Sequence, residues 1–311
     1  MPKNRIVVMG SSNTDMIIKV PRIPRPGETI TGGKFSMAAG GKGANQAVAA
    51  ARSGGRVTLI ARVGNDLFGE TAIEDFAADG IDVHCVLKDG EAPSGTALIF
   101  VGEDGENSIG VAPGANARLT RTDVERFREV IESADMLVMQ LETPMETVEA
   151  AAGIAANKGV RTILNPAPAA PVPPDILALV GILTPNEHEA KVLTGVEVRD
   201  ETGARRAAEA LVKQGVGTAL ITLGAQGAFV LSEDFRGMVR GYAVEAVDST
   251  AAGDVFNGAL AVALCEGRPL RDAVVFANAA AALSVTRLGA QPSIPRRREI
   301  DAFLSSRGAS A

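Results

Sequence analysis

Residues 136–164 of the chain read MLVMQLETPMETVEAAAGIAANKGVRTIL. The apolar runs at 136–140 and 161–164 are typical of short buried strands, and the alanine-rich segment 145–157 between them has the length of a helix. A strand, a helix and a second strand in this order predict an α/β protein.

The same alternation extends in both directions along the chain. Further strands are predicted at 5–9, 57–63, 182–184, 219–223, 228–231 and 239–247. Further helices are predicted at 44–52, 68–78, 122–131, 175–180, 187–193, 202–214, 254–266, 270–286 and 297–304. This pattern indicates a central, mostly parallel sheet with helices on both faces.

Two segments do not fit the alternation. Residues 15–37 and 93–111 contain short strands, at 16–20, 28–37, 97–101 and 108–111, that proline and glycine interrupt. We expect these segments to form a small, separate antiparallel sheet inserted into a single domain that spans residues 1–311. Such a sheet would act as a lid over a ligand at the carboxyl ends of the parallel strands.

The composition is that of an ordinary globular protein, with 46% hydrophobic and 22% charged residues among 311. The net charge of −6 argues against a general nucleic-acid-binding surface. Cys85 and Cys265 match no metal-binding spacing and are expected to be reduced thiols. The first residues lack the apolar stretch of a signal peptide, and no segment is long enough to span a bilayer. We therefore expect a cytoplasmic protein with no membrane or nucleic-acid partner.

The segment Ala251-Ala252-Gly253-Asp254 opens a long apolar helix. Free N–H groups at a helix start attract anions, and small residues let a ligand approach them closely. A carboxylate beside such an anion hole can take a proton from an attacking hydroxyl, which is the equipment needed for phosphoryl transfer to an alcohol. The structural alternative is that Asp254 only caps the helix.

Two polar motifs follow the first strand. Asn13 and Asp15 come directly after it, where ligands of α/β proteins bind, and their side chains suit sugar hydroxyls. In the run GGKGAN at 40–45, the glycines let the backbone approach a polar ligand closely, Lys42 provides a cation and Asn45 provides an amide. Neither a Walker A loop nor a dinucleotide fingerprint is present. The structural alternatives are an Asx turn for the residues at 13–15 and an ordinary glycine-rich start of a helix for the run at 40–45.

Two later motifs suit a nucleotide. Asn186 and Glu189 share one face of a helix and suit a hydrated Mg²⁺, although a solvated helix start would look the same. The turn at 222–227 follows an apolar strand and either holds a nucleotide through its backbone or is an ordinary tight turn.

Taken in order, these motifs resemble the ribokinase family of carbohydrate kinases over essentially the whole chain. The resemblance is carried by NTD at 13–15, GGKGAN at 40–45, Glu142, NPAP at 165–168, TPNE at 184–187 with Glu189, TLG at 222–224, DSTAAGDVFNG at 248–258 and GAQPS at 289–293.

The resemblance implies a role for each matching residue. Asp254 would be the catalytic base, with an anion hole from Ala251, Ala252 and Gly253. The sugar would be held, together with Asp254, by Asn13, Asp15, Gly41, Lys42, Gly43, Ala44, Asn45 and Glu142. The nucleotide would lie against Asn186, Thr222, Leu223, Gly224, Ala225, Gln226, Gly227, Gly253 and Asn278, with Mg²⁺ held by Glu189 through water. A monovalent cation, K⁺, would be bound by Asp248, Thr250, Ser284, Arg287, Gly289 and Ser293.

The function implied is ATP-dependent phosphorylation of D-ribose at its primary hydroxyl, in a homodimer formed through the lid. Two positions depart from the family pattern: Ala251 replaces a frequent glycine, and Asn278 stands where close relatives often have histidine. The alternatives are a kinase for deoxyribose, another sugar or a nucleoside, and a non-catalytic sugar- or nucleotide-binding regulator. A dinucleotide oxidoreductase is disfavoured by the missing glycine fingerprint.

Overall fold

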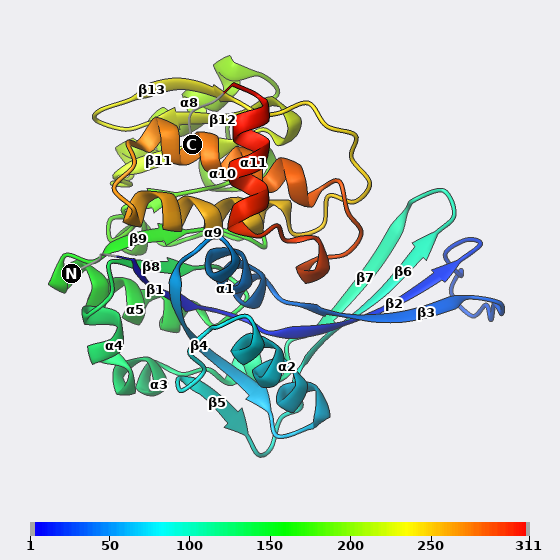
Figure 1. Ribbon diagram of the computed structural model, residues 1–311. Coiled ribbons are helices and arrows are strands. Elements are labelled where there is room, and N and C mark those ends of the chain that lie inside the picture. The colour runs from blue at the N-terminus through cyan, green and yellow to red at the C-terminus, as the bar shows by residue number, and fades with distance from the viewer. Residues whose placement is uncertain (1–3, 309–311) are drawn as a thin grey trace.

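The computed structural model describes residues 4–308. Its body is a nine-stranded sheet in the order β13-β12-β11-β10-β9-β8-β1-β4-β5 (Figure 1). The strands are β1 Arg5–Met9, β4 Arg56–Gly64, β5 Val86–Asp89, β8 Met136–Met139, β9 Arg161–Leu164, β10 Ile182–Leu183, β11 Thr218–Thr222, β12 Gly227–Leu231 and β13 Arg236–Arg240. Pairing is parallel from β11 to β5, and β12 and β13 are antiparallel additions at one edge. The predicted mostly parallel sheet is confirmed.

Helices cover both faces of this sheet, as the strand–helix alternation predicted (Figure 1). One face packs against α1 Lys42–Arg52, α2 Leu67–Ala78, α9 Ala252–Cys265, α10 Leu270–Ser284 and α11 Arg297–Ser306. The other packs against α3 Arg121–Arg126, α4 Arg128–Glu132, α5 Met145–Lys158, α6 Pro174–Leu177, α7 Glu187–Thr194 and α8 Glu201–Lys213. Alternate residues of β1 enter the two cores, with Ile6 and Val8 on one side and Val7 and Met9 on the other.

Three local predictions differ from the structure, and one strand was not predicted. The strand expected at 28–37 starts at Lys34, because the preceding residues form a loop closed by the Arg22–Glu28 ion pair. The helix expected at 122–131 breaks at Phe127, whose N–H donates to Val124 in a tight turn. The strand expected at 239–247 ends at Arg240, and β5 was not predicted.

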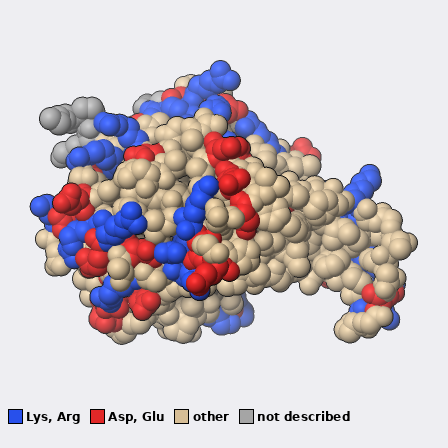
Figure 2. Space-filling view, turned by 90° about the horizontal axis from the view of Figure 1, so that it is seen from below, with Lys and Arg blue, Asp and Glu red and all other residues tan. Residues whose placement is uncertain are grey.

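The inserted lid projects from the body as a four-stranded sheet in the order β3-β2-β6-β7 (Figure 1). Its strands are β2 Asn13–Val20, β3 Lys34–Gly40, β6 Gly95–Gly102 and β7 Asn107–Ala112. The two outer pairs are antiparallel, whereas the central β2–β6 pair is parallel because these strands come from distant segments that both leave the body in the same direction. Over much of the face seen in Figure 2 the lid carries few charged side chains.

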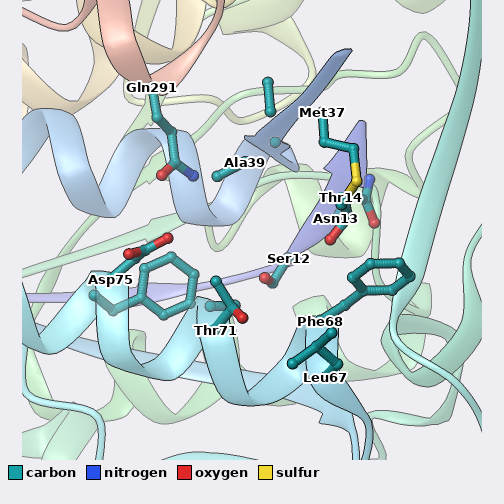
Figure 3. A pocket seen from close by; sticks show the side chains of 14 residues that line it. Ser12, Asn13, Thr14, Met37, Ala39, Leu67, Phe68, Thr71, Asp75 and Gln291 are labelled. Atoms are coloured by element: carbon teal, nitrogen blue, oxygen red, sulfur yellow. The ribbon is translucent and has the colours of Figure 1, made fainter. Parts of the chain in front are cut away.

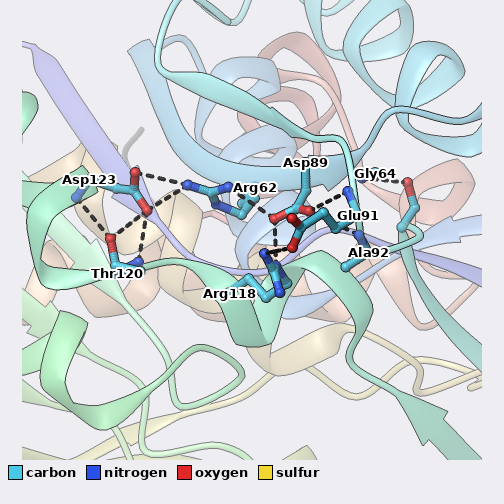
Figure 4. Close-up of polar contacts among 9 residues, drawn as sticks. Arg62, Gly64, Asp89, Glu91, Ala92, Arg118, Thr120 and Asp123 are labelled. Carbon is cyan, nitrogen blue, oxygen red and sulfur yellow. Dashed lines mark hydrogen bonds and ion pairs between the residues drawn. The ribbon is translucent and has the colours of Figure 1, made fainter.

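An ion-pair network fixes the loop that leads into lid strand β6 (Figure 4). Asp89, which is 3% exposed, accepts hydrogen bonds from Arg62 at 3.0 Å and Arg118 at 2.8 Å. Its other oxygen accepts the N–H groups of Glu91 and Ala92. These backbone bonds and the two guanidinium groups hold the pKa of the Asp89 carboxyl well below its usual range. The root of the lid is thereby tied to the rigid sheet.

No helix among residues 4–308 is long and apolar enough to cross a membrane.

Candidate active site

Asp254 lies in the first turn of α9 and is 5% exposed. Its Oδ1 accepts a hydrogen bond from Gln46 Nε2 at 2.9 Å, and its Oδ2 accepts one from Asn45 Nδ2 at 3.0 Å. Burial raises the pKa of the Asp254 carboxyl, while the Lys42 ammonium and the two amides oppose this increase. Its side chain therefore bonds to α1 rather than capping its own helix.

The turn before α9 leaves N–H groups available for an anion. Ala251 has φ 61° and is the one non-glycine residue of the described chain with a left-handed backbone. The N–H of Ala252 donates to Ser249 and that of Val255 to Ala251. Those of Gly253 and Asp254, between them, make no hydrogen bond within residues 4–308. Two free donors thus lie beside the Asp254 carboxylate.

The predicted sugar residues come together where β1 and β8 end and α1 and β2 begin. Glu142 Oε2 accepts hydrogen bonds from Ser11 Oγ at 2.5 Å and from the N–H of Lys42 at 2.9 Å. Asn13 Oδ1 accepts a hydrogen bond from Asn116 Nδ2 at 2.7 Å. Sequence reasoning missed Ser11 and Asn116, because neither stands in a motif with a recognisable spacing.

The glycine-rich run serves packing between protein segments. A Cβ on Gly43 would lie 2.5 Å from the nitrogen of Ser11, and one on Gly41 would lie 2.7 Å from the nitrogen of Asn13. The N–H of Ala44 donates to the Ser11 carbonyl at 2.8 Å. The absence of side chains at 41 and 43 therefore lets α1 start directly against the end of β1, which brings Lys42 and Asn45 into the site.

Negative charge dominates this site. Burial lowers the pKa of Lys42, but Asp254, Glu142, Glu189 and Asp15 together raise it above its usual value. Burial raises the pKa of Asp15 to about 6, with Glu142 adding to the increase and Lys42 opposing it. Four carboxyl groups thus act on the charge of one ammonium group, and this excess of negative charge favours an additional cation.

The predicted nucleotide residues lie on neighbouring segments. Asn186 and Glu189 form a capping box at the start of α7, in which Glu189 accepts hydrogen bonds from the N–H and the amide of Asn186 at 2.9 Å each. Asn186 also forms a parallel bridge with Thr222, which begins the turn at 222–227. Burial raises the pKa of Glu189, and the Asn186 N–H and Lys42 oppose this increase.

Asn278 is buried in α10, and its amide donates to the carbonyls of Val239 and Arg240 at 3.2 Å each. These bonds hold the end of β13, a structural use of the amide that the sequence did not indicate.

The residues expected around a monovalent cation lie on the loop before α9, at the end of α10 and on the segment that follows α10. Asp248 accepts hydrogen bonds from the N–H and hydroxyl of Thr250, and from the N–H of Gly289 at 2.8 Å. Ser284 and Ser293 each donate to a carbonyl three residues earlier, and Arg287 pairs with Glu299. Asp248 therefore ties the loop before α9 to the loop after α10. Among residues 4–308, no group of three or more His, Cys, Asp or Glu side chains is arranged to hold a metal ion.

A cavity of about 260 Å³ lies between the root of the lid and α2 (Figure 3). It is lined in part by Thr14, Met37, Leu67, Phe68 and Gln291. Because successive side chains of a strand alternate, Thr14 faces this cavity and Asp15 points to the opposite face of the lid. Asn13, one of the predicted sugar residues, also lines the cavity, so the cavity adjoins the predicted sugar site.

The fold and the site together define a carbohydrate kinase: residues 3–297 match the profile of the pfkB family carbohydrate kinases, and the chain belongs to this family. It is 47% identical to the ribokinase of Haemophilus influenzae, over 97% of this chain and 99% of that protein. The structure of Arabidopsis thaliana ribokinase complexed with ribose and ATP matches with a TM-score of 0.89 at 32% identity, covering 97% of this chain and 99% of that one. The crystal structure of Thermotoga maritima ribokinase also gives 0.89, at 39% identity and the same coverage.

Proposed function

We propose that this chain transfers the terminal phosphoryl group of ATP to the primary hydroxyl of D-ribose, giving D-ribose 5-phosphate. The observation that carries the proposal is the buried Asp254 carboxylate beside the free N–H groups of Gly253 and Asp254. The similarity to ribokinases over nearly the whole chain, including one complexed with ribose and ATP, supports this substrate pair.

In this proposal Asp254 accepts the proton of the attacking hydroxyl. Its raised pKa strengthens it as a base, and its fixed position at the start of α9 sets the direction of attack. The N–H groups of Gly253 and Asp254 donate to the phosphoryl oxygens as charge develops, and Ala251 and Ala252 shape the turn that exposes these donors.

The sugar hydroxyls are read by Asn13, Asp15, Lys42, Asn45 and Glu142, with Gly41, Gly43 and Ala44 providing the adjoining backbone. Asn45 supports this assignment directly, because its Oδ1 is buried and has no hydrogen-bond partner within the described residues. A buried carbonyl oxygen left in this state is stabilised when a ligand hydroxyl donates to it.

The nucleotide would be held by Asn186, the turn at 222–227, Gly253 and Asn278, and Glu189 would hold Mg²⁺ through water. When bound, Mg²⁺ neutralises phosphate charge. The residues present fit this ion, because the carboxylates around Lys42 leave the site with excess negative charge that ATP increases.

A potassium ion is proposed between the two loops that Asp248 joins, near Thr250, Ser284, Arg287, Gly289 and Ser293. When bound, it adds positive charge beside the turn that leads to Asp254. Asp248 fits this role because hydrogen bonds from Thr250 and Gly289 outweigh burial and lower the pKa of its carboxyl, which keeps it ionised.

A homodimer through the lid is proposed from the apolar side chains that the lid exposes. Phe35, Met37 and Leu98 lie on one face of the lid, and their exposed fractions are 63%, 50% and 56%, respectively. The cavity that Met37 helps to line continues this face toward α2. A second copy of the chain would bury these side chains. Met37→Glu should convert a dimer to a monomer in light scattering, and an unchanged mass would exclude this face as the interface.

We place the reaction in the cytoplasm, in keeping with the two free, buried cysteines.

An ADP-release assay with D-ribose, 2-deoxyribose, other sugars and nucleosides tests the function. We expect the highest kcat/KM with D-ribose. A higher value with another acceptor would replace ribose as the substrate, and no turnover with any acceptor would favour a binding regulator.

A further inference from the structure

Besides Asn45, three buried amides connect to the carboxylate of Asp254, one directly and two through it. Gln46 of α1 is fully buried, and its Nε2 donates to Asp254 Oδ1 at 2.9 Å and to Asn165 Oδ1 at 3.1 Å. Gln140, which directly follows β8 and is also fully buried, donates from Nε2 to Gln46 Oε1 at 2.7 Å. None of these three side chains belongs to the sugar or nucleotide sets described above.

The partners of Gln46 fix which way its amide points. Its nitrogen faces two oxygens, from Asp254 and Asn165, and its oxygen faces the NH₂ group of Gln140. Rotation of the amide by half a turn would set its oxygen against a carboxylate and would leave the Gln140 NH₂ without an acceptor. The two acceptors therefore select the orientation in which Gln46 donates to Asp254. Gln140, whose own Oε1 is buried without a partner within the described residues, adds a donor that favours the same orientation.

A second branch of the same network reaches the first turn of α9. Asn165 Nδ2 donates to the carbonyl of Thr184 at 3.3 Å, and the Thr184 hydroxyl donates to Asn257 Oδ1 at 2.7 Å. Asn257 Nδ2 then donates to the carbonyl of Gly253 at 2.8 Å. The carboxylate of Asp254 and the peptide group next to it are therefore held by one connected set of buried side chains.

We propose that Gln46 is a positioning residue for Asp254 and that Gln140 acts through it. Gln46 holds one carboxylate oxygen of Asp254 and Asn45 holds the other, so that the rotation of the carboxylate about χ2 is fixed before substrate binds. Gln140 favours the donating orientation of the Gln46 amide through the hydrogen bond to its Oε1. This inference rests on the proposed kinase function, in which Asp254 is the base.

The chemistry of the base gives this arrangement a measurable consequence. A donor to the carboxylate stabilises its charged form, and the Gln46 amide is among the groups that oppose the effect of burial on the Asp254 pKa. Loss of this donor should therefore raise the pKa of Asp254 and allow the carboxylate to rotate. The sugar contacts of Asn13, Lys42 and Glu142 should remain.

Gln46→Met and Gln140→Met test the proposal, because methionine keeps the volume and removes the amide. We expect kcat to fall by about 10- to 100-fold in Gln46→Met and by a smaller factor in Gln140→Met. The KM for D-ribose should change less than threefold. The acidic limb of the kcat–pH profile should move to higher pH in both variants. The double variant should be no slower than Gln46→Met, since Gln140 acts only through Gln46.

Thr147→Val is a matched control, because Thr147 is a fully buried polar residue of α5 whose hydroxyl donates to the Pro144 carbonyl away from the site. It should lose stability without any shift of the kcat–pH profile. Wild-type kcat and pH profile in Gln46→Met, or multiplicative losses in the double variant, would overturn the inference. If Gln46→Met does not fold, an unchanged pH profile in Gln140→Met overturns it. Absence of turnover in the wild-type protein would instead refute the proposed function.

Discussion

Gly258 lies where α9 crosses α1, and a methyl group at this position is the most informative single perturbation of the site. A Cβ at 258 would lie 2.6 Å from the Cβ of Ala49, 2.6 Å from the carbonyl oxygen of Gln46 and 2.7 Å from the nitrogen of Ala50, whereas ordinary contact starts at 3.4 Å. Two of these atoms belong to the α1 backbone, so the clash is relieved only if the helices separate.

The size of the effect follows from this geometry. Overpacking of a dense core costs about 1–3 kcal/mol, and we expect the upper end of this range because a side-chain rotation cannot relieve the contact. The separation acts on the segment that carries Gln46, whose amide bonds to Asp254 at 2.9 Å. Misplacement of reacting groups by about 1 Å reduces rates about 10²-fold, so a smaller displacement here should lower kcat by about 10-fold or more.

Gly258→Ala is therefore expected to lose about 2–3 kcal/mol of unfolding free energy in urea denaturation and to show a reduced kcat in the ADP-release assay. Gly153→Ala is the matched control, because Gly153 is also helical and a Cβ there meets no atom within 4 Å. The unfolding free energy of the control variant should be unchanged or should rise by about 0.5–1 kcal/mol. Wild-type stability and kcat in Gly258→Ala would refute the claim that the close packing of α1 against α9 positions the residues of the site.

Four further outcomes are expected. Asp254→Asn should lower kcat by about 10²–10⁴-fold with little change in ribose affinity by calorimetry, because size is kept and basicity is lost; near-normal kcat in a folded variant excludes Asp254 as the base. Acidification below pH 6 should weaken ribose binding, since it protonates Asp15, whose pKa burial raises to about 6, and removes an acceptor; Asp15→Asn should abolish this pH dependence, and a flat wild-type profile contradicts the role. Potassium should activate more than sodium at matched ionic strength, and Asp248→Ala should flatten that response; equal wild-type rates in K⁺, Na⁺ and a bulky organic cation remove the proposed site. Asp89→Asn should lower the unfolding free energy by about 1–3 kcal/mol, because it removes the buried charge that Arg62 and Arg118 share and leaves them only Asp123 and Glu91; an unchanged urea midpoint shows that this network does not stabilise the fold.

Local sequence patterns were enough to predict the layers of the body. Apolar runs such as 136–140 and 161–164 indicate strands that are buried on both faces of a sheet. The carboxyl ends of parallel strands lie at one edge of that sheet. Polar motifs that follow different strands, such as Asn13 after β1 and Glu142 after β8, could therefore be expected at the same place. Their roles remain predictions, but their proximity follows from the topology.

Where pairing joins distant segments, only the tertiary structure decided the result. The parallel β2–β6 pair and the short strand β5 depend on neighbours far along the chain, and the segments' own residues contain no signal for them. Likewise, nothing in the local sequence distinguishes Gln46 and Gln140 from ordinary polar residues.

The amide cluster shows the physical reason most clearly. Gln46 lies 208 residues from Asp254 and 94 from Gln140, and the hydrogen bonds between them exist only because α1, α9 and β8 pack together. Asn278 illustrates the same limit, since the resemblance implied a nucleotide contact but gave no sign that its amide also bonds the carbonyls at the end of β13. The sequence by itself determined which segments are buried and where the chemical groups cluster. The orientation of each group depends on hydrogen bonds between residues remote in sequence, so the tertiary structure alone determined it.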